Sequence, residues 1–363
     1  MEQHGTALPN AGRQFELDFA KFIAIVCMIL VHCYDYSSLY LSSMAAHVTS
    51  SWGLLIEFLG AQPAAPVFMF CMGIGLVYTR HNTAGEFARR GVKLLVTGYL
   101  LNLYRTLFVT GGGLAGALGT HEVLPMVAAF ALCVDILPFA GLAFLFFALM
   151  KRLNVSHALA SLVVLALLLL ASVLPTVGDG KAWYSYLAGL LWYQNDFTSF
   201  PLMQWLPFPM AGVICGTRLK AATDKGRFYW RMLAVGVAAF AVTTLLACYR
   251  GDDLTTFFTS RYFDMNLLRW TWSLGIVLML LPIYYFLVKD LAEGWLTQLA
   301  TFCSRNINKI YLWQWILITP ISLLALAIFP IDSYWKLALE VALVFAACIF
   351  IVAALSKKKP ARH

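Results

Sequence analysis

Long apolar runs separated by short polar segments are the main pattern along the chain. A helix that crosses the hydrocarbon core of a bilayer needs about 20 mostly apolar residues. Ten runs approach this length, at residues 20–41, 63–79, 91–110, 128–150, 156–175, 201–217, 230–248, 268–288, 309–329 and 334–355. The pattern therefore predicts an all-α, polytopic membrane protein with about ten transmembrane helices.

The second apolar run is interrupted by two prolines, Pro63 and Pro66. Proline lacks a backbone donor and breaks a helix when it lies in the interior. We therefore expect residues 53–62 to form a separate segment, interfacial or re-entrant, ahead of the second span.

The composition agrees with a membrane protein. Hydrophobic residues make up 61% of the 363 residues and charged residues only 12%, against about 25% charged in soluble domains. This leaves no room for a large soluble domain. We expect a cytoplasmic tail at 1–16, a transmembrane domain at 17–356 and a basic cytoplasmic tail at 357–363, with the first apolar run kept as a helix instead of being cleaved as a signal peptide.

The positions of the basic residues predict the orientation, because cytoplasmic loops are rich in Lys and Arg. If both termini are cytoplasmic, all but six of the 26 Lys and Arg residues face the cytoplasm. The six exceptions are Arg105, Lys181, Arg250, Arg261, Arg269 and Lys336. The net charge of +8 therefore reflects topology, and we do not expect nucleic-acid binding.

Eight cysteines are scattered singly along the chain, at Cys27, Cys33, Cys71, Cys133, Cys215, Cys248, Cys303 and Cys348. No CxxC pair occurs, and no Cys/His group has the spacing of a metal site. We expect neither a disulfide framework nor a metal cofactor.

Two polar residues on the first apolar run carry candidate chemistry. Lys21 and His32 are eleven residues apart, which is three helical turns plus about 20°, so they share one face. The rise between them is about 16 Å, so the imidazole lies deep in the membrane if Lys21 lies at its edge. Asp18 precedes Lys21 by one turn on the same stripe. Polar groups at such depth are costly and are usually functional. The alternatives are a structural histidine that bonds to a neighbouring helix and a lysine that extends to the membrane edge.

A basic residue, ten intervening residues and a histidine on the first helix resemble the signature of bacterial membrane O-acyltransferases that modify envelope glycans. The residues from Asp18 to Val31 resemble, more closely, the catalytic domain of heparan-α-glucosaminide N-acetyltransferase and its bacterial relatives. Six further motifs resemble that family in the same order along the chain: His47 with Trp52-Gly53, Pro66 to Gly73, Asp135-Ile136-Leu137 with Gly141-Leu142, Pro201 to Gly216, Arg261-Tyr262 ahead of Leu274-Gly275, and Asn306 with Tyr311 and Trp315.

Three positions depart from the pattern of these relatives. The spacing from His47 to Trp52 is longer than in the family, Phe263 replaces a common proline, and Gln314 replaces a common histidine. These differences concern the acceptor more than the reaction type.

The resemblance implies a transfer of an acyl group from cytoplasmic acetyl-CoA to a hydroxyl or amine on the outer side. Such a reaction needs a cationic entrance for the coenzyme phosphates and a base or acyl relay at depth. We expect the entrance to contain Lys21, Arg89, Arg90 and Lys93, with Arg90 and Lys93 on one helix face. Plain cytoplasmic charge is the alternative explanation for these cations.

His32 is the first choice for the general base, because a neutral imidazole titrates near working pH. His47, on the outer side, is the competing choice, and both could act. Asp135 could orient an imidazole, as a carboxylate does in a catalytic triad, or it could simply pair with Arg105. Acceptor binding is assigned to Arg105, Trp205, Arg261 and Gln314.

The expected partners are the bilayer, acyl-CoA and a glycan or glycolipid acceptor, and the expected location is a bacterial inner membrane. The N-acetyltransferase resemblance is also compatible with a homodimer. The alternative function is a transporter or flippase for a glycan or lipid-linked substrate, which ten helices would also suit. However, the chain shows no obvious inverted repeat and few carboxylates at depth, such as Glu57, Asp135 and Glu340.

Overall fold

The computed structural model of the protein describes residues 9–46, 50–109, 131–175, 183–192, 198–259 and 262–357. These residues form helices and connecting loops, and no strand occurs among them. The helices before residue 131 are α1 Phe15–Asp35, α2 Ser38–Ala46, α3 Ser51–Ala61, α4 Ala65–Tyr78 and α5 Ala84–Val109. Those after it are α8 Ile136–Arg152, α9 His157–Ala171, α10 Trp183–Leu191, α11 Leu202–Trp205, α12 Pro207–Ala221, α13 Lys225–Arg250, the 3-10 turn η2 Leu254–Phe257, α14 Leu267–Val288, α15 Trp295–Arg305, α16 Ile307–Ile328 and α17 Tyr334–Lys357.

The all-helical class is confirmed. Among the described residues, five segments are long and apolar enough to cross a membrane, at Phe15–Asp35, Ser51–Tyr78, Lys225–Arg250, Leu267–Val288 and Tyr334–Lys357. The other predicted spans coincide with α5, α8, α9, α12 and α16. Their crossing of the bilayer, and thus the number ten, stays a prediction.

Several predicted boundaries were wrong by five residues or more, and two of them have a clear physical cause. The first helix spans Phe15–Asp35 instead of 20–41, because Ser37 ends it. The Ser37 hydroxyl donates to the Tyr34 carbonyl at 2.7 Å and accepts from the Tyr40 backbone N–H at 3.2 Å, which starts α2. The predicted span 128–150 begins as α8 only at Ile136, because the Asp135 carboxylate caps the N-terminus of that helix.

The predicted break at the two prolines is confirmed, since α3 ends at Ala61 and α4 begins at Ala65. A helix break in a membrane leaves backbone groups that need partners. The Tyr262 hydroxyl donates to the Ala61 carbonyl at 2.9 Å. The buried Gln62 side chain donates to the Phe257 carbonyl at 3.2 Å. The loop before α14 thus stabilises the break between α3 and α4.

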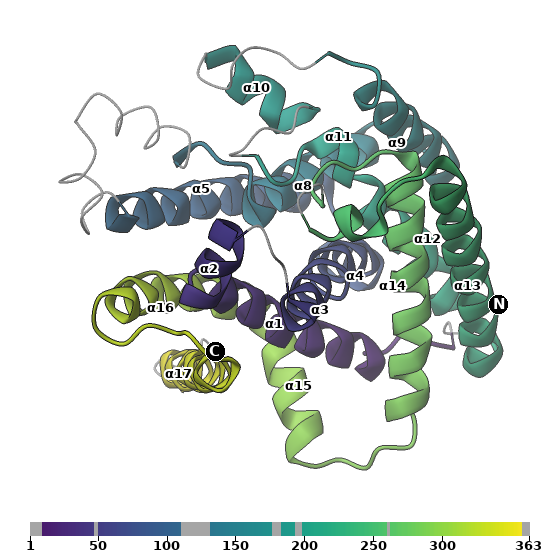
Figure 1. The fold of residues 1–363 in the computed structure, drawn as a ribbon. Coiled ribbons are helices and arrows are strands. Elements are labelled where there is room, and N and C mark those ends of the chain that lie inside the picture. The colour runs from purple at the N-terminus through teal and green to yellow at the C-terminus, as the bar shows by residue number, and fades with distance from the viewer. Residues whose placement is uncertain are drawn as a thin grey trace, which may run out of the picture.

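Helix α1 crosses the middle of the molecule (Figure 1). It packs against α3, α4, α14, α15, α16 and α17. Its fully buried residues include Ala20, Ala24, Ile25 and Ile29. Because so many elements contact α1, a side chain on it can meet residues from most of the chain.

Glycines allow three helix pairs to approach closely, as small residues do in membrane proteins. At the crossing of α4 and α12, a Cβ on Gly73 would lie 1.9 Å from the Pro209 carbonyl oxygen, and one on Gly212 would lie 2.0 Å from the Phe70 carbonyl oxygen. The pairs α5–α8 and α13–α14 have similar contacts through their own glycines, Gly91 with Gly141 and Gly236 with Gly275.

We expect the Gly212→Ala variant to be less stable than the wild type by about 1–3 kcal/mol, because the backbones of α4 and α12 must separate to admit the methyl group. Gly75→Ala on α4 is the matched control. Its Cβ would meet nothing within 4 Å, and alanine favours a helix interior by about 0.5–1 kcal/mol over glycine. Thermal unfolding of the purified proteins measures both; equal melting temperatures would contradict the close crossing.

Candidate active site

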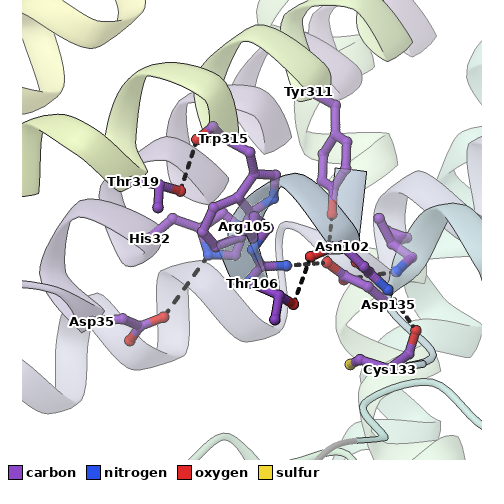
Figure 2. Close-up of polar contacts among 11 residues, drawn as sticks. His32, Asp35, Asn102, Arg105, Thr106, Cys133, Asp135, Tyr311, Trp315 and Thr319 are labelled. Atoms are coloured by element: carbon purple, nitrogen blue, oxygen red, sulfur yellow. Dashed lines mark hydrogen bonds and ion pairs between the residues drawn. The ribbon is translucent and has the colours of Figure 1, made fainter. Parts of the chain in front are cut away.

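His32 lies near the C-terminal end of α1, with its side chain 22% exposed. Its imidazole ring contacts the indole ring of Trp315 on α16, with the ring centroids 4.2 Å apart (Figure 2). The His32 Nδ1 atom is 3.8 Å from the Asp35 Oδ2 atom, which is too far for a hydrogen bond. No hydrogen bond from the described residues reaches this buried nitrogen. The imidazole is therefore placed by its packing on Trp315 and not by a hydrogen bond to Nδ1.

Trp315 also contacts Arg105 on α5. The guanidinium carbon of Arg105 lies 3.6 Å from the centroid of the Trp315 ring, within the range of a cation–π interaction. Trp315 is 3% exposed. One buried indole therefore joins the imidazole of α1 to the cation of α5.

The Asp135 carboxylate accepts three hydrogen bonds. Its Oδ2 atom accepts from the Arg105 guanidinium at 2.9 Å and from the Tyr311 hydroxyl at 2.8 Å (Figure 2). Its Oδ1 atom accepts from the Ile136 backbone N–H at 2.7 Å. Of the two alternatives for Asp135, the structure shows the pairing with Arg105. The carboxylate within 4 Å of His32 is that of Asp35.

Two side chains of α5 donate to backbone carbonyls beside these groups and hold them in place. The Asn102 amide donates to the Cys133 carbonyl at 2.8 Å, just before Asp135. The Tyr104 hydroxyl donates to the Ile316 carbonyl at 3.0 Å, just after Trp315. Helix α5 therefore holds both the start of α8 and the middle of α16, and the site is formed by four segments of the chain.

The remaining residues predicted to bind the acceptor lie in other surroundings. Trp205 is fully buried, contacts Phe200, Phe208 and Tyr262 in an aromatic cluster, and donates its indole N–H to the Phe263 carbonyl at 3.2 Å. Its role in binding substrate stays a prediction beside this packing role.

Gln314 precedes Trp315 on α16 and is fully buried. Neither atom of its amide has a hydrogen-bond partner among the described residues, so this side chain keeps its capacity to bind a polar group. The predicted residues His47 and Arg261 lie outside the described residues.

The predicted cationic residues are on two helices. Arg89, Arg90 and Lys93 are exposed on α5, and the Arg90 guanidinium carbon lies 4.5 Å from the centroid of the Phe144 ring. Lys21 is half-buried on α1. A shared entrance for the coenzyme stays a prediction.

A capping box starts the helix that carries these cations. The Thr83 hydroxyl accepts from the Glu86 backbone N–H at 3.2 Å, and the Glu86 carboxylate accepts from the Thr83 backbone N–H at 2.9 Å. Hydrogen bonds from Thr83, with a further one from His81, lower the pKa of the Glu86 carboxyl to about 2. The carboxylate therefore stays charged, and the cap stays complete, at pH values well above 2.

The polar start of α1 is paired with other segments of the chain. Asp18 accepts from the Arg13 guanidinium at 2.5 Å and from the Ser304 hydroxyl at 2.6 Å. Glu16 accepts from the Tyr229 hydroxyl at 2.8 Å and pairs with Lys225 at 2.8 Å. These contacts attach the N-terminal end of α1 to α13 and α15.

Comparison with known proteins decides the family. A family model described as an acyltransferase domain, of the membrane O-acyltransferase type, matches residues 14–357. The chain belongs to the acyltransferase 3 family. No curated protein matches the chain. Membership in this family supports an acyltransferase embedded in a membrane. The matched segment is nearly the whole chain and includes every described residue of the site. The narrower resemblance to the N-acetyltransferase stays a prediction.

In this acyltransferase, His32, Arg105 and Asp135 were predicted from the sequence as site residues. Tyr311 and Trp315, which contact them, were not predicted to belong to the site. Both are buried aromatic residues on α16. The available signal was their place in the closing motif, one turn apart on one helix face, but aromatic residues at this spacing are common in any helix core.

Proposed function

We propose that the protein transfers an acetyl group from cytoplasmic acetyl-CoA to a hydroxyl or amine of a glycan or glycolipid on the outer side of a bacterial inner membrane. The family supports the acyl transfer. The donor, the acceptor, the cytoplasmic position of both termini and the EC 2.3.1 class are parts of the proposal. The family match favours this function over a transporter.

The observation that carries the proposal is the placement of His32. Its imidazole lies in the last turn of α1, with its side chain 22% exposed, and the described residues give its Nδ1 atom no hydrogen bond. A structural histidine that is mostly buried would be expected to use its ring nitrogens in hydrogen bonds. The His32 imidazole is instead held by a tilted ring contact with Trp315, and the exposed part of the ring is available to a substrate.

The proposed chemistry uses His32 as a general base. The imidazole takes the proton from the acceptor hydroxyl or amine, whose oxygen or nitrogen forms the new bond to the thioester carbonyl carbon. The carbon–sulfur bond breaks, and the coenzyme thiolate leaves with the proton returned by the imidazolium. The same balance holds if His32 first accepts the acyl group and then passes it on. His47 is the alternative base.

Arg105 and Asp135 support this chemistry from the other side of Trp315. The Arg105 guanidinium is held by the Asp135 carboxylate and the Trp315 ring. A cation fixed in this way can stabilise negative charge that develops on the thioester oxygen without reorganising during the reaction. Asp135 therefore acts as a positioning residue for Arg105, not for His32.

Calorimetric titration of acetyl-CoA into the purified protein tests the proposal, with dephosphorylated coenzyme A as the control ligand. We expect micromolar binding by acetyl-CoA and weaker binding without the phosphate, because cations at the entrance bind that group. Absence of binding at millimolar acetyl-CoA would contradict the proposed function and favour a transporter.

The same titration locates the entrance. Neutralising Arg90 and Lys93 together should weaken acetyl-CoA binding, and raise its apparent KM, while acceptor binding is unchanged. An unchanged affinity in this variant would show that these exposed cations serve only the membrane topology.

A further inference from the structure

A cavity outside the candidate active site lies between α15 and the C-terminal end of α17. Its volume is about 530 Å³. Six residues line it: Gln298, Thr301, Phe302, Arg305, Asn306 and Ser356. Five of these side chains are polar, and Phe302 supplies an aromatic wall. None of the six makes a contact with the His32, Trp315, Arg105 and Asp135 group in the described residues.

Two cations border this cavity. Arg305 lines it and forms no ion pair with a carboxylate of the described residues. Lys309 extends across its rim, where its ammonium donates to the Asn306 amide oxygen at 3.0 Å and to the Ser356 hydroxyl at 3.3 Å. The cavity therefore offers two cations to an anion, with no carboxylate among its lining residues. The Ser356 hydroxyl and one Asn306 amide N–H already donate to the Val352 and Phe302 carbonyls.

The cavity also adjoins a surface suited to lipid. Ser356 ends α17, a helix of 24 residues that is apolar enough to span a membrane. Phe350 and Leu355, which are 74% and 46% exposed, lie within about 9 Å of Ser356 along the helix axis. Leu355 lies about 100° and Phe350 about 120° around the helix from Ser356, so the acyl chains of an amphiphile with its headgroup at Arg305 and Lys309 would run along the sides of α17 to reach them.

We propose that this cavity binds the headgroup of an anionic phospholipid from the leaflet that borders the C-terminal end of α17. Basic pockets between transmembrane helices are a known way to bind such headgroups. Free phosphate would use the cations but not the apolar surface. The bilayer leaflet beside the C-terminal end of α17 would supply the phospholipid directly to this cavity.

Lipid binding here would stabilise the start of α1. Arg305 follows Ser304, whose hydroxyl donates to the Asp18 carboxylate at 2.6 Å. A lipid that holds the end of α15 therefore also holds the N-terminal end of the helix that carries His32.

Titration of short-chain phosphatidylglycerol into the detergent-purified protein tests the proposal, with phosphatidylcholine of the same chain length as the neutral control. We expect phosphatidylglycerol to bind at least tenfold more tightly and to raise the melting temperature. The double variant Arg305→Gln/Lys309→Gln should weaken phosphatidylglycerol binding about 30-fold, which corresponds to about 2 kcal/mol for two cations.

The matched control is Arg227→Gln/Arg231→Gln, which removes two exposed cations four residues apart on α13 and should leave binding unchanged. The charge-preserving variant Arg305→Lys/Lys309→Arg should also retain binding, which separates loss of charge from loss of fold. Equal affinity of the wild type and Arg305→Gln/Lys309→Gln, or equal binding of both lipids, would overturn the proposal. Displacement of the lipid by equimolar inorganic phosphate or coenzyme A would overturn the assignment to a lipid.

Discussion

The His32→Ala variant is expected to lose acyl transfer by at least about 100-fold while it still inserts and folds, because general-base catalysis contributes about 10²–10⁴-fold. His32 makes no hydrogen bond through its Nδ1 atom in the described residues, so its removal should disturb the fold little. The measurement is the rate of thiol release from acetyl-CoA in the presence of acceptor, together with the elution volume and melting temperature of the variant.

The matched control for this variant is His157→Ala. His157 is exposed at the start of α9, and its loss should leave the rate unchanged. Full activity in His32→Ala would exclude His32 as the base, and the same measurement on His47→Ala would then test the competing histidine. An equal loss in both variants would indicate that both histidines take part.

The Asp135→Ala variant is expected to lower the free energy of unfolding by about 3–5 kcal/mol, because it leaves the Arg105 cation without its counter-ion in a largely buried place. The side chains of Arg105 and Asp135 are 21% and 16% exposed. The variant also removes the acceptor of the Tyr311 hydroxyl and the cap of α8. Reversible unfolding of the purified protein by denaturant measures the change.

Asp290→Ala is the control for this pair. Asp290 is 82% exposed and pairs with Lys289 at 2.6 Å, and exposed pairs contribute only about 0–1 kcal/mol. The double variant Arg105→Gln/Asp135→Asn removes both charges and should recover part of the stability. If Asp135→Ala were as stable as the Asp290→Ala control, the buried pair would not be important to the fold.

The sequence predicted the class of protein and most helices because both depend on local patterns. Apolar runs of membrane-spanning length require helices, since every backbone group in a bilayer must bond within its own segment or to a neighbour. Pro63 and Pro66 predicted the break that separates α3 from α4. Two helix ends were predicted wrongly where a single hydrogen-bonding side chain sets them, Ser37 after α1 and Asp135 before α8.

The site was only partly predictable. The helical period places Lys21 and His32 on one face of α1, and this needs no knowledge of the other helices. The partner of Asp135 was open between an imidazole and Arg105. The two residues of the observed pair are 30 positions apart on different helices, and no local rule sets which faces of two helices meet.

The sequence by itself determined that the chain is an apolar, all-helical protein with Lys21 and His32 on one face of its first helix, because composition and periodicity act within each segment. The predicted mid-membrane depth of His32 is not supported, since α1 ends at Asp35, three residues later. The tertiary structure alone decided that Trp315 links His32 to Arg105, that Asp135 pairs with Arg105 and Tyr311, and that Asp18 pairs with Arg13 and Ser304. The physical reason is that these contacts depend on how closely and at which angle the helices cross. Gly91 and Gly141, for example, permit the close crossing of α5 and α8, the helices beside the Arg105–Asp135 pair, but the two glycines are on separate helices 50 residues apart.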